Sequence, residues 1–301
     1  MKRREFIQKT ALTSVMVGLP TLPLMSFTSD KIKHITILHT NDTHSHIDPF
    51  EASHPRNPNM GGVARRAALV EQIRRENPNT LLLDAGDIFQ GTPYFNYYGG
   101  ELEFKLMSMM KYDAATLGNH EFDNGLEGFL APIPNANFDF INSNYDFSNT
   151  ILDGFIKKHK MFNLDGIKIG IFGLGIELEG LVSKSHYKET QYLDPIEIAQ
   201  EMTRFLKEEQ KCDLVVCLSH LGYRYNNDKI SDLVLASKTK NIDLIIGGHT
   251  HTFLNKPTIV SNIEDKSVIV NQVGCYGINL GRIDFYFESG KTISNGLSIE
   301  V

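Results

Sequence analysis

Five short polar motifs, each placed directly after an apolar run, carry most of the side chains in this sequence that are suited to catalysis. They are Asp42-Thr43-His44, Gly86-Asp87, Gly118-Asn119-His120-Glu121, Ser219-His220 and Gly247-Gly248-His249-Thr250-His251. Together they supply enough oxygen and nitrogen ligands to hold two metal ions around one shared carboxylate. Two metal ions about 3.5–4 Å apart are a recognised device for in-line displacement at phosphorus. The complete set predicts such a centre, whereas Asp-x-His or Gly-Asp alone is common in turns.

The segments before these motifs alternate between strand and helix patterns. Strands are predicted over residues 35–38, 81–83, 114–117, 214–218 and 244–246. Helices are predicted over residues 62–76, 101–110 and 194–210, the last with Asp194 as N-cap and Pro195 in its first turn. This alternation indicates an α/β fold whose first half pairs mainly in parallel. Because sites in such sheets collect beyond the carboxyl ends of the strands, motifs far apart in sequence are expected to converge.

The rest of the chain is predicted to be rich in strands. Asp165-Gly166 is a strong two-residue hairpin signal between strands over residues 155–164 and 167–174. Residues 268–273 and 279–287 also read as strands. No repeat or linker is visible after residue 31, so residues 30–301 are expected to form one domain.

Composition excludes several classes of partner and architecture. The formal net charge is −6, and no basic run occurs beyond the extreme N-terminus, so a nucleic-acid polymer is not an expected partner. The three cysteines do not form a disulfide framework, and Cys217 lies in an apolar run that predicts a buried thiol. No apolar run reaches the length of a membrane span, so no stable membrane insertion is expected after removal of the N-terminal segment.

The N-terminal segment has the features of an export signal. Arg3 and Arg4 are followed by Phe6-Ile7 and then by a moderately apolar run over residues 11–27. This order resembles a twin-arginine signal peptide, assigned to residues 1–29, and implies a periplasmic or otherwise exported protein. The alternative is an amphipathic first helix, but Pro20 and Pro23 oppose it because an internal proline removes a helical hydrogen bond.

Several motifs together resemble the catalytic domain of the 5′-nucleotidases, which are calcineurin-like metallophosphoesterases. The resemblance spans roughly residues 32–290 and is carried by Leu83–Asp87, Phe89–Pro93, Leu117–Asp123 and Gly248–His251. It implies a four-layer sandwich in which two β-sheets are flanked by helices. It also implies two divalent metal ions, with Mn, Zn, Fe and Co left open because mixed nitrogen and oxygen ligands suit all four. One ion would be bound by Asp42, His44, Asp87 and His251, and the other by Asp87, Asn119, His220 and His249.

The resemblance gives His120 and Asp123 a catalytic role beside the metals. It implies hydrolysis of nucleoside monophosphates or related phosphate esters by a metal-activated water, with a His120–Asp123 pair stabilising charge in the transition state. An alternative for Asp123 is the N-cap of a following helix, and both roles are compatible. His39 and His46 are expected to lie in loops or behind the ligands. Arg65 and Arg66 can reach a phosphate, but solvent exposure on an amphipathic helix is the favoured interpretation.

Substrate selection depends on features outside the metal-binding motifs. Typical 5′-nucleotidases continue into a second domain that recognises the nucleoside, whereas this sequence ends at Val301. We therefore expect either a separate 5′-nucleotidase C-terminal-domain protein as partner, or little recognition of the base. Tyr94, Phe95, Tyr97 and Tyr98 are able to stack on a ligand, although packing is the commoner role of such a stretch. A thiosulfohydrolase-like enzyme of the same superfamily and a non-catalytic phosphoester-binding subunit are the alternative functions.

Export is expected to depend on the arginine pair. Arg3→Lys combined with Arg4→Lys keeps the positive charge but removes the feature that a twin-arginine receptor reads. Cell fractionation is expected to find the doubly substituted, folded protein in the cytoplasm. Unchanged appearance outside the inner membrane would instead indicate the general secretory route.

Overall fold

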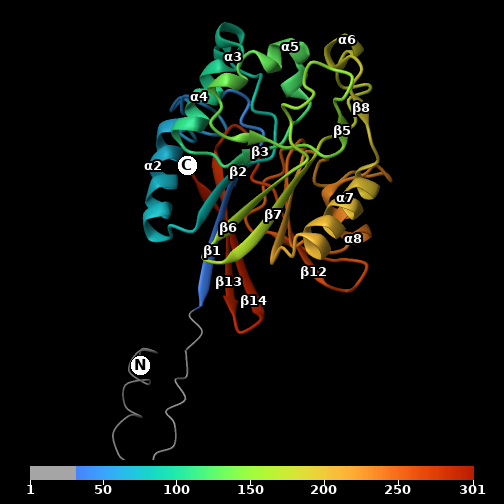
Figure 1. The fold of residues 1–301 in the computed structure, drawn as a ribbon. Helices are drawn as coiled ribbons and strands as arrows, with labels where there is room; N and C mark the ends of the chain where they lie inside the picture. The colour runs from blue at the N-terminus through green and yellow to red at the C-terminus, as the bar shows by residue number, and fades with distance from the viewer. Residues whose placement is uncertain (1–31) are drawn as a thin grey trace, which may run out of the picture. The chain divides into compact units, whose positions relative to one another are not determined.

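Two six-stranded sheets form the framework of the computed structural model, which describes residues 32–301 (Figure 1). The first sheet has the order β14-β13-β1-β2-β3-β4. Strands β1 to β4 pair in parallel, whereas the β13–β14 hairpin joins the edge of β1 in antiparallel fashion. The strands are β1 (Lys33–Thr40), β2 (Thr80–Asp84), β3 (Ala114–Ala115), β4 (Asp139–Phe140), β13 (Asn279–Glu288) and β14 (Lys291–Glu300).

The second sheet has the order β11-β12-β10-β9-β7-β6. Its four central strands are parallel, and each edge strand is antiparallel to its neighbour. The strands are β6 (His159–Leu164), β7 (Ile167–Leu174), β9 (Leu214–Ser219), β10 (Leu244–Gly247), β11 (Thr258–Ser261) and β12 (Ser267–Asn271). A separate two-stranded pair is formed by β5 (Tyr145–Asp146) and β8 (Gln191–Tyr192).

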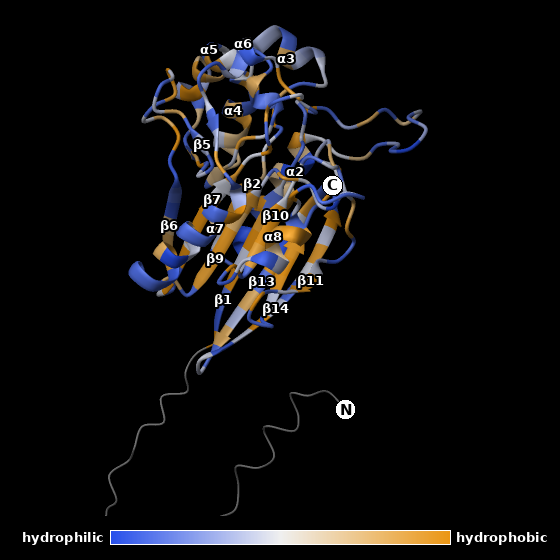
Figure 2. Ribbon diagram, turned by 90° about the vertical axis from the view of Figure 1, so that its right-hand side faces the viewer, coloured by the Kyte–Doolittle hydropathy of each residue, from blue (hydrophilic) through white to orange (hydrophobic). Residues whose placement is uncertain are grey.

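Apolar side chains fill the space between the two sheets. Ile37 and Leu83 from the first sheet pack in one buried cluster with Ile171, Val216 and Ile246 from the second. The central strands are apolar on both faces because each sheet is covered on both sides, as Figure 2 shows by their orange colour. Burial of these faces is the main stabilising contribution to the sandwich.

Helices cover the outer face of each sheet and complete four layers. The first sheet is covered by α2 (Val63–Glu76), α3 (Pro93–Tyr98), α4 (Glu101–Met109) and α5 (Gly125–Leu130), whose apolar residues share one cluster with Leu38 and Leu82. The second sheet is covered by α7 (Pro195–Arg204) and α8 (Asp232–Lys238). A short helix, α6 (Lys184–Tyr187), lies near α5. The four-layer arrangement implied by the resemblance is therefore confirmed.

Most of the predicted elements are present, with differences at their ends. The third predicted strand is reduced to the two residues of β3, and β6 begins four residues later than predicted. The predicted helix over residues 194–210 has Asp194 as N-cap, but it changes into a π-helical turn over Phe205–Glu209. Strand β14 was not predicted. The expected signal over residues 1–29 lies outside the described residues.

The observed hairpin and cysteine environments agree with the sequence interpretation. Leu164 pairs with Ile167 around Asp165 and Gly166, whose φ values of 50° and 76° suit a tight hairpin turn. Cys217 is fully buried, and burial raises the pKa of its thiol well above the usual value. Among residues 32–301, no helix has both the length and the apolar character needed to cross a membrane.

The packing of α4 against the first sheet predicts a large loss of stability for one truncation. Phe104 is fully buried, with ring centroids 5.0 Å from those of Phe89 and Phe140. Phe104→Ala is expected to lower the free energy of unfolding by about 3–5 kcal/mol in denaturant titrations, because it leaves a cavity. Met109→Ala is the matched control, since Met109 lies on the same helix and is 78% exposed, so its effect should stay within about 0.5 kcal/mol. Equal losses from the two substitutions would contradict this packing.

Candidate metal centre

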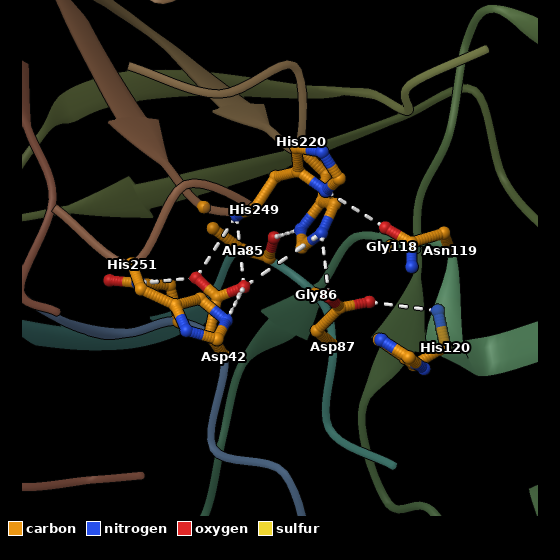
Figure 3. Close-up of polar contacts among 12 residues, drawn as sticks. Asp42, Ala85, Gly86, Asp87, Gly118, Asn119, His120, His220, His249 and His251 are labelled. Carbon is orange, nitrogen blue, oxygen red and sulfur yellow. Dashed lines mark hydrogen bonds and ion pairs between the residues drawn. The ribbon is translucent and has the colours of Figure 1, made fainter. Parts of the chain in front are cut away.

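Five strand-to-loop junctions bring the predicted site residues to one edge of the sandwich (Figure 3). Asp42 and His44 follow β1, Asp87 follows β2, and Asn119 with His120 follows β3. His220 follows β9, and the pair His249 and His251 follows β10. The motifs converge because both sheets end their parallel strands at this edge.

A first group of possible ligand atoms comes from Asp42, His44 and His251, all within 4.8 Å of one another. The Nε2 atoms of His44 and His251 are 2.9 Å apart, and His251 Nε2 is 3.4 Å from Asp42 Oδ1. His44 Nδ1 donates a hydrogen bond to the carbonyl oxygen of Phe89 at 3.1 Å. The lone pair of His44 Nε2 therefore faces the group, as a metal ligand requires.

A second group comes from Asp87, His220 and His249, again within 4.8 Å. His220 Nδ1 donates to the carbonyl oxygen of Ala85 at 2.7 Å, which leaves a lone pair on Nε2. That Nε2 lies 3.0 Å from Asp87 Oδ2, yet it is buried without a hydrogen-bond partner. An unpartnered nitrogen facing a carboxylate oxygen fits a cation held by both. Asn119 Oδ1 lies 2.9 Å from His249 Nδ1 and adds an amide oxygen to this group.

The Asp87 carboxylate joins the two groups. Its Oδ2 is 3.0 Å from His220 Nε2 and 3.9 Å from His44 Nε2, so it faces one histidine of each group. Its Oδ1 accepts the backbone N–H of His120 at 2.9 Å. Besides its place with His220, Asp87 also lies within 4.8 Å of possible ligand atoms of His44 and His120. A carboxylate with histidines of both groups around it is the arrangement expected of a bridging ligand.

The electrostatics of these groups favour positive charge. Burial raises the pKa of Asp87, but His220 beside it outweighs this effect and holds the pKa well below its usual range. Burial lowers the pKa of His220, yet the Asp87 carboxylate raises it further, to about 10. The pKa of His251 also reaches about 10, because Asp42 outweighs burial. Negative charge at this edge therefore favours a positive charge between the side chains, whether carried by protons or by metal ions.

His249 has the opposite electrostatic environment. Burial and the neighbouring His220 lower its pKa to about 4, so its imidazole is neutral. A neutral imidazole is the form in which histidine coordinates a metal ion.

Five of the seven predicted ligands have a left-handed backbone. The φ values are between 48° and 70° at Asp42, His44, Asp87, His249 and His251. Residues other than glycine rarely adopt this region, at a cost of about 1–3 kcal/mol each, and such strain concentrates at functional sites. The tight loops aim alternate side chains, such as those of His249 and His251, at the same edge.

Glycines give the histidine rings and carboxylates space to meet. A Cβ atom on Gly118 would collide with the Asp87 carboxylate, and one on Gly248 would lie 2.7 Å from His220 Nδ1. These glycines are therefore required by close packing of the site.

Glu121 has a structural role that the sequence interpretation missed. It is buried, and its carboxylate accepts the backbone N–H groups of Asp87, Ile88 and Gly118 at 2.9, 2.7 and 2.6 Å. Burial and the nearby Asp87 raise its pKa to about 7, although these three donors favour the ionised form. Glu121 thereby ties the loop after β2 to the loop after β3. Its place inside the Gly-Asn-His-Glu motif was the available signal.

Two further polar residues order the loops from behind. Gln272 donates to the carbonyl oxygen of Gly248 at 2.5 Å and accepts from the backbone of Thr252. Asn41 donates to Asp42 Oδ2 at 2.6 Å and accepts the backbone N–H of Val273 at 3.0 Å. Neither position carries a local sequence signal, because each role depends on contacts across the sheet.

His120 and Asp123 form the predicted pair beside the second group. His120 Nδ1 lies 2.8 Å from Asp123 Oδ2, and both side chains are partly exposed. Burial lowers the pKa of His120, but the hydrogen bond to Asp123 and the charge of Asp87 raise it overall. The two carboxylates thus favour the imidazolium form of His120. Asp123 is not the helix N-cap considered above, since Asn124 occupies that position before α5.

Three other sequence interpretations have different outcomes. His39 lies in β1 and is not in a loop; it is buried between the sheets with its Nε2 2.8 Å from Asn271 Nδ2, and burial lowers its pKa to about 3. His46 stays in the loop near the ligands and packs on Tyr276. Solvent exposure holds for Arg65 but is wrong for Arg66, which is only 4% exposed and lines a small cavity of about 20 Å³ with the buried Glu103.

Comparison with known proteins gives relatives over most of the chain. Residues 35–253 match the calcineurin-like phosphoesterase family. The chain is 36% identical to the trifunctional nucleotide phosphoesterase protein YfkN of Bacillus subtilis, covering 89% of this chain and 19% of that protein. It is 34% identical to the snake venom 5′-nucleotidase of Naja atra, covering 86% of this chain and 51% of that protein.

A solved structure supports the same relationship. The 5′-nucleotidase precursor of Thermus thermophilus superposes with a TM-score of 0.81 at 34% identity, over 89% of this chain and 55% of that chain. This chain thus spans about half or less of the length of these relatives. The family match covers most of residues 32–301 and includes all seven predicted ligands. The chain therefore belongs to the calcineurin-like phosphoesterase family.

Proposed function

We propose that this chain is a hydrolase with two divalent metal ions that acts on nucleoside monophosphates or related phosphate esters. The observation that carries the proposal is the junction of two ligand groups at Asp87, with the His120–Asp123 pair at their edge. In this assignment, Asp42, His44, Asp87 and His251 hold one ion. Asp87, Asn119, His220 and His249 hold the other.

The side chains of this site have separate tasks in the proposed reaction. Two bound ions would supply Lewis acidity toward a phosphoryl oxygen and lower the pKa of water. His120, held by Asp123, would donate a charge-assisted hydrogen bond to oxygens that gain negative charge in the transition state. Glu121 keeps the loops of Asp87 and Asn119 at a fixed separation, so these groups are arranged before substrate binds.

A non-catalytic binding subunit is less well supported than an enzyme. Binding a phosphoester requires the metal ligands but gives no reason for a His120–Asp123 hydrogen bond beside them. The names of the two relatives and of the solved structure also favour nucleotide phosphoesters as substrates. Export by a twin-arginine route and a separate specificity protein remain parts of the proposal that rest on the sequence.

Metal content and turnover are expected to change together. The purified protein should contain about two divalent ions and hydrolyse an aryl phosphate or nucleoside monophosphate. Chelation should abolish turnover and metal addition should restore it, as measured by phosphate release and elemental analysis. His251→Ala should lower metal occupancy, whereas His159→Ala, on a strand outside the ligand groups, should not. Full activity of metal-free protein would contradict the proposal.

The His120 side chain is expected to affect turnover more than metal binding. His120→Asn removes the charge-assisted donor but leaves the predicted ligands, so kcat should fall by about 10²–10³ with nearly unchanged metal content. His159→Asn is the matched control, because it makes the same substitution on β6, outside the ligand groups, and should leave kcat unchanged. The assigned role would be wrong if His120→Asn emptied the site or left the rate unaltered.

A further inference from the structure

A pocket of about 490 Å³ lies beside the candidate metal centre, between the loop after β1 and the start of α3. This volume is within the usual range of small-molecule sites, about 300–1,000 Å³. The pocket is distinct from the site described above, because its lining includes neither the predicted ligands nor the His120–Asp123 pair. The lining residues that bear on its chemistry are His46, Asp48, Phe50, Glu51, His54 and Tyr94.

Tyr276 connects this pocket to the metal centre. Its ring centroid is 5.9 Å from that of His44 and 5.8 Å from that of His251, both predicted ligands. On its other side, the Tyr276 ring lies 4.4 Å from His46 and 5.9 Å from Phe50, which line the pocket. The pocket and the predicted ligands therefore lie on opposite sides of one aromatic ring, which places the pocket next to the metal centre.

The pocket wall carries four aromatic or imidazole rings. His46, Phe50 and His54 follow one another with centroid separations of 4.9 and 4.5 Å. Tyr94 contributes a further aromatic ring from the α3 side, and its hydroxyl donates to Asp48 Oδ2 at 2.6 Å across the pocket. This bond joins the two walls.

The tyrosines of the stretch from Tyr94 to Tyr98 differ in their relation to this pocket. Tyr94 lines it, whereas Tyr97 is 86% exposed and lies outside it. Tyr97 therefore offers a matched aromatic side chain on the same helix that does not contact a molecule in the pocket.

The negative charge of the pocket lining disfavours anionic ligands. Asp48 and Glu51 contribute carboxylates, and the lining residues, all within the described range 32–301, include no lysine or arginine. His54 Nδ1 accepts the backbone N–H of Asn57 at 3.0 Å, so its other nitrogen is available as a donor. Such a lining accepts hydrogen bonds from amino or hydroxyl groups and repels additional phosphates.

We propose that this pocket binds the leaving group of the substrate, and that the leaving group is an uncharged aromatic one such as a nucleoside. The inference rests on the proposed function, because that function places the phosphate at the metals. Phe50 is then a specificity-determining residue. It contacts the ring of the leaving group, while the phosphoryl chemistry takes place at Asp87 and His120.

Direct binding of adenosine tests the pocket without requiring turnover. Calorimetry with the metal-loaded full chain is expected to detect adenosine binding to the wild type. Phe50→Ala should weaken it by about tenfold or more, since stacking of a base on an aromatic side chain contributes about 1–3 kcal/mol. Tyr97→Ala is the matched control, because it removes an aromatic ring of the adjacent helix that does not line the pocket. Absence of wild-type binding, or an equal effect of both substitutions, would overturn the proposal.

Kinetics separate this inference from the proposed function. In Phe50→Ala, kcat/KM for AMP should fall by about tenfold, whereas kcat/KM for glycerol phosphate, which has no ring, should stay near the wild-type value. A similar fall for both substrates would assign Phe50 to the phosphate site and overturn the pocket. If the wild type hydrolyses neither ester, the proposed function is refuted. Adenosine binding that is lost in Phe50→Ala would still support the pocket in that case.

Discussion

The buried Asp87 carboxylate is the interaction on which the whole candidate centre depends. It lies where the loops of both sheets meet, with His220 3.0 Å from one oxygen and the backbone N–H of His120 2.9 Å from the other. A buried carboxylate is strongly destabilising unless opposite charge or hydrogen bonds compensate it. Histidines from three loops, His44, His120 and His220, provide that compensation. Convergence of the five motifs is thus an electrostatic requirement as well as a consequence of topology.

The same requirement explains why the strand ends are strained. A strand that ended in an ordinary turn would present one side chain to the edge, but Asp42 and His44 must both face the same point. Left-handed φ values at both residues achieve this, as they do at His249 and His251. Glycines take the positions where a side chain would block the meeting, such as Gly118 against Asp87. Packing of the two-sheet core supplies the stability that offsets these local costs.

The sequence predicted the elements and residues that follow from local patterns. It did not predict the features that arise only from contacts between distant parts of the chain. Apolar strands followed by Asp, Asn or His identified residues that the structure brings together at one edge, because strand direction places such loops there. Arg66 occupies a helix position that reads as exposed, yet the helix packs it over a cavity beside Glu103. Strand β14 has the polar and exposed pattern of a surface segment, and only its pairing along β13 makes it a strand. The roles of Gln272 and Asn41 likewise depend on partners that are distant in the sequence.

The backbone and the side chain of His120 make different contacts, so the two can be considered separately. The backbone N–H of His120 donates to the Asp87 carboxylate, whereas its imidazole is hydrogen-bonded to Asp123. The loop position is fixed independently by Glu121, which accepts the N–H groups of Gly118 and Asp87. The hydrogen bonds that hold this loop to the Asp87 loop therefore come from the His120 backbone and from Glu121, and not from the imidazole. Substitution of the imidazole therefore leaves those backbone contacts in place, which is why His120 can be tested for the proposed catalytic role separately from the architecture of the loops.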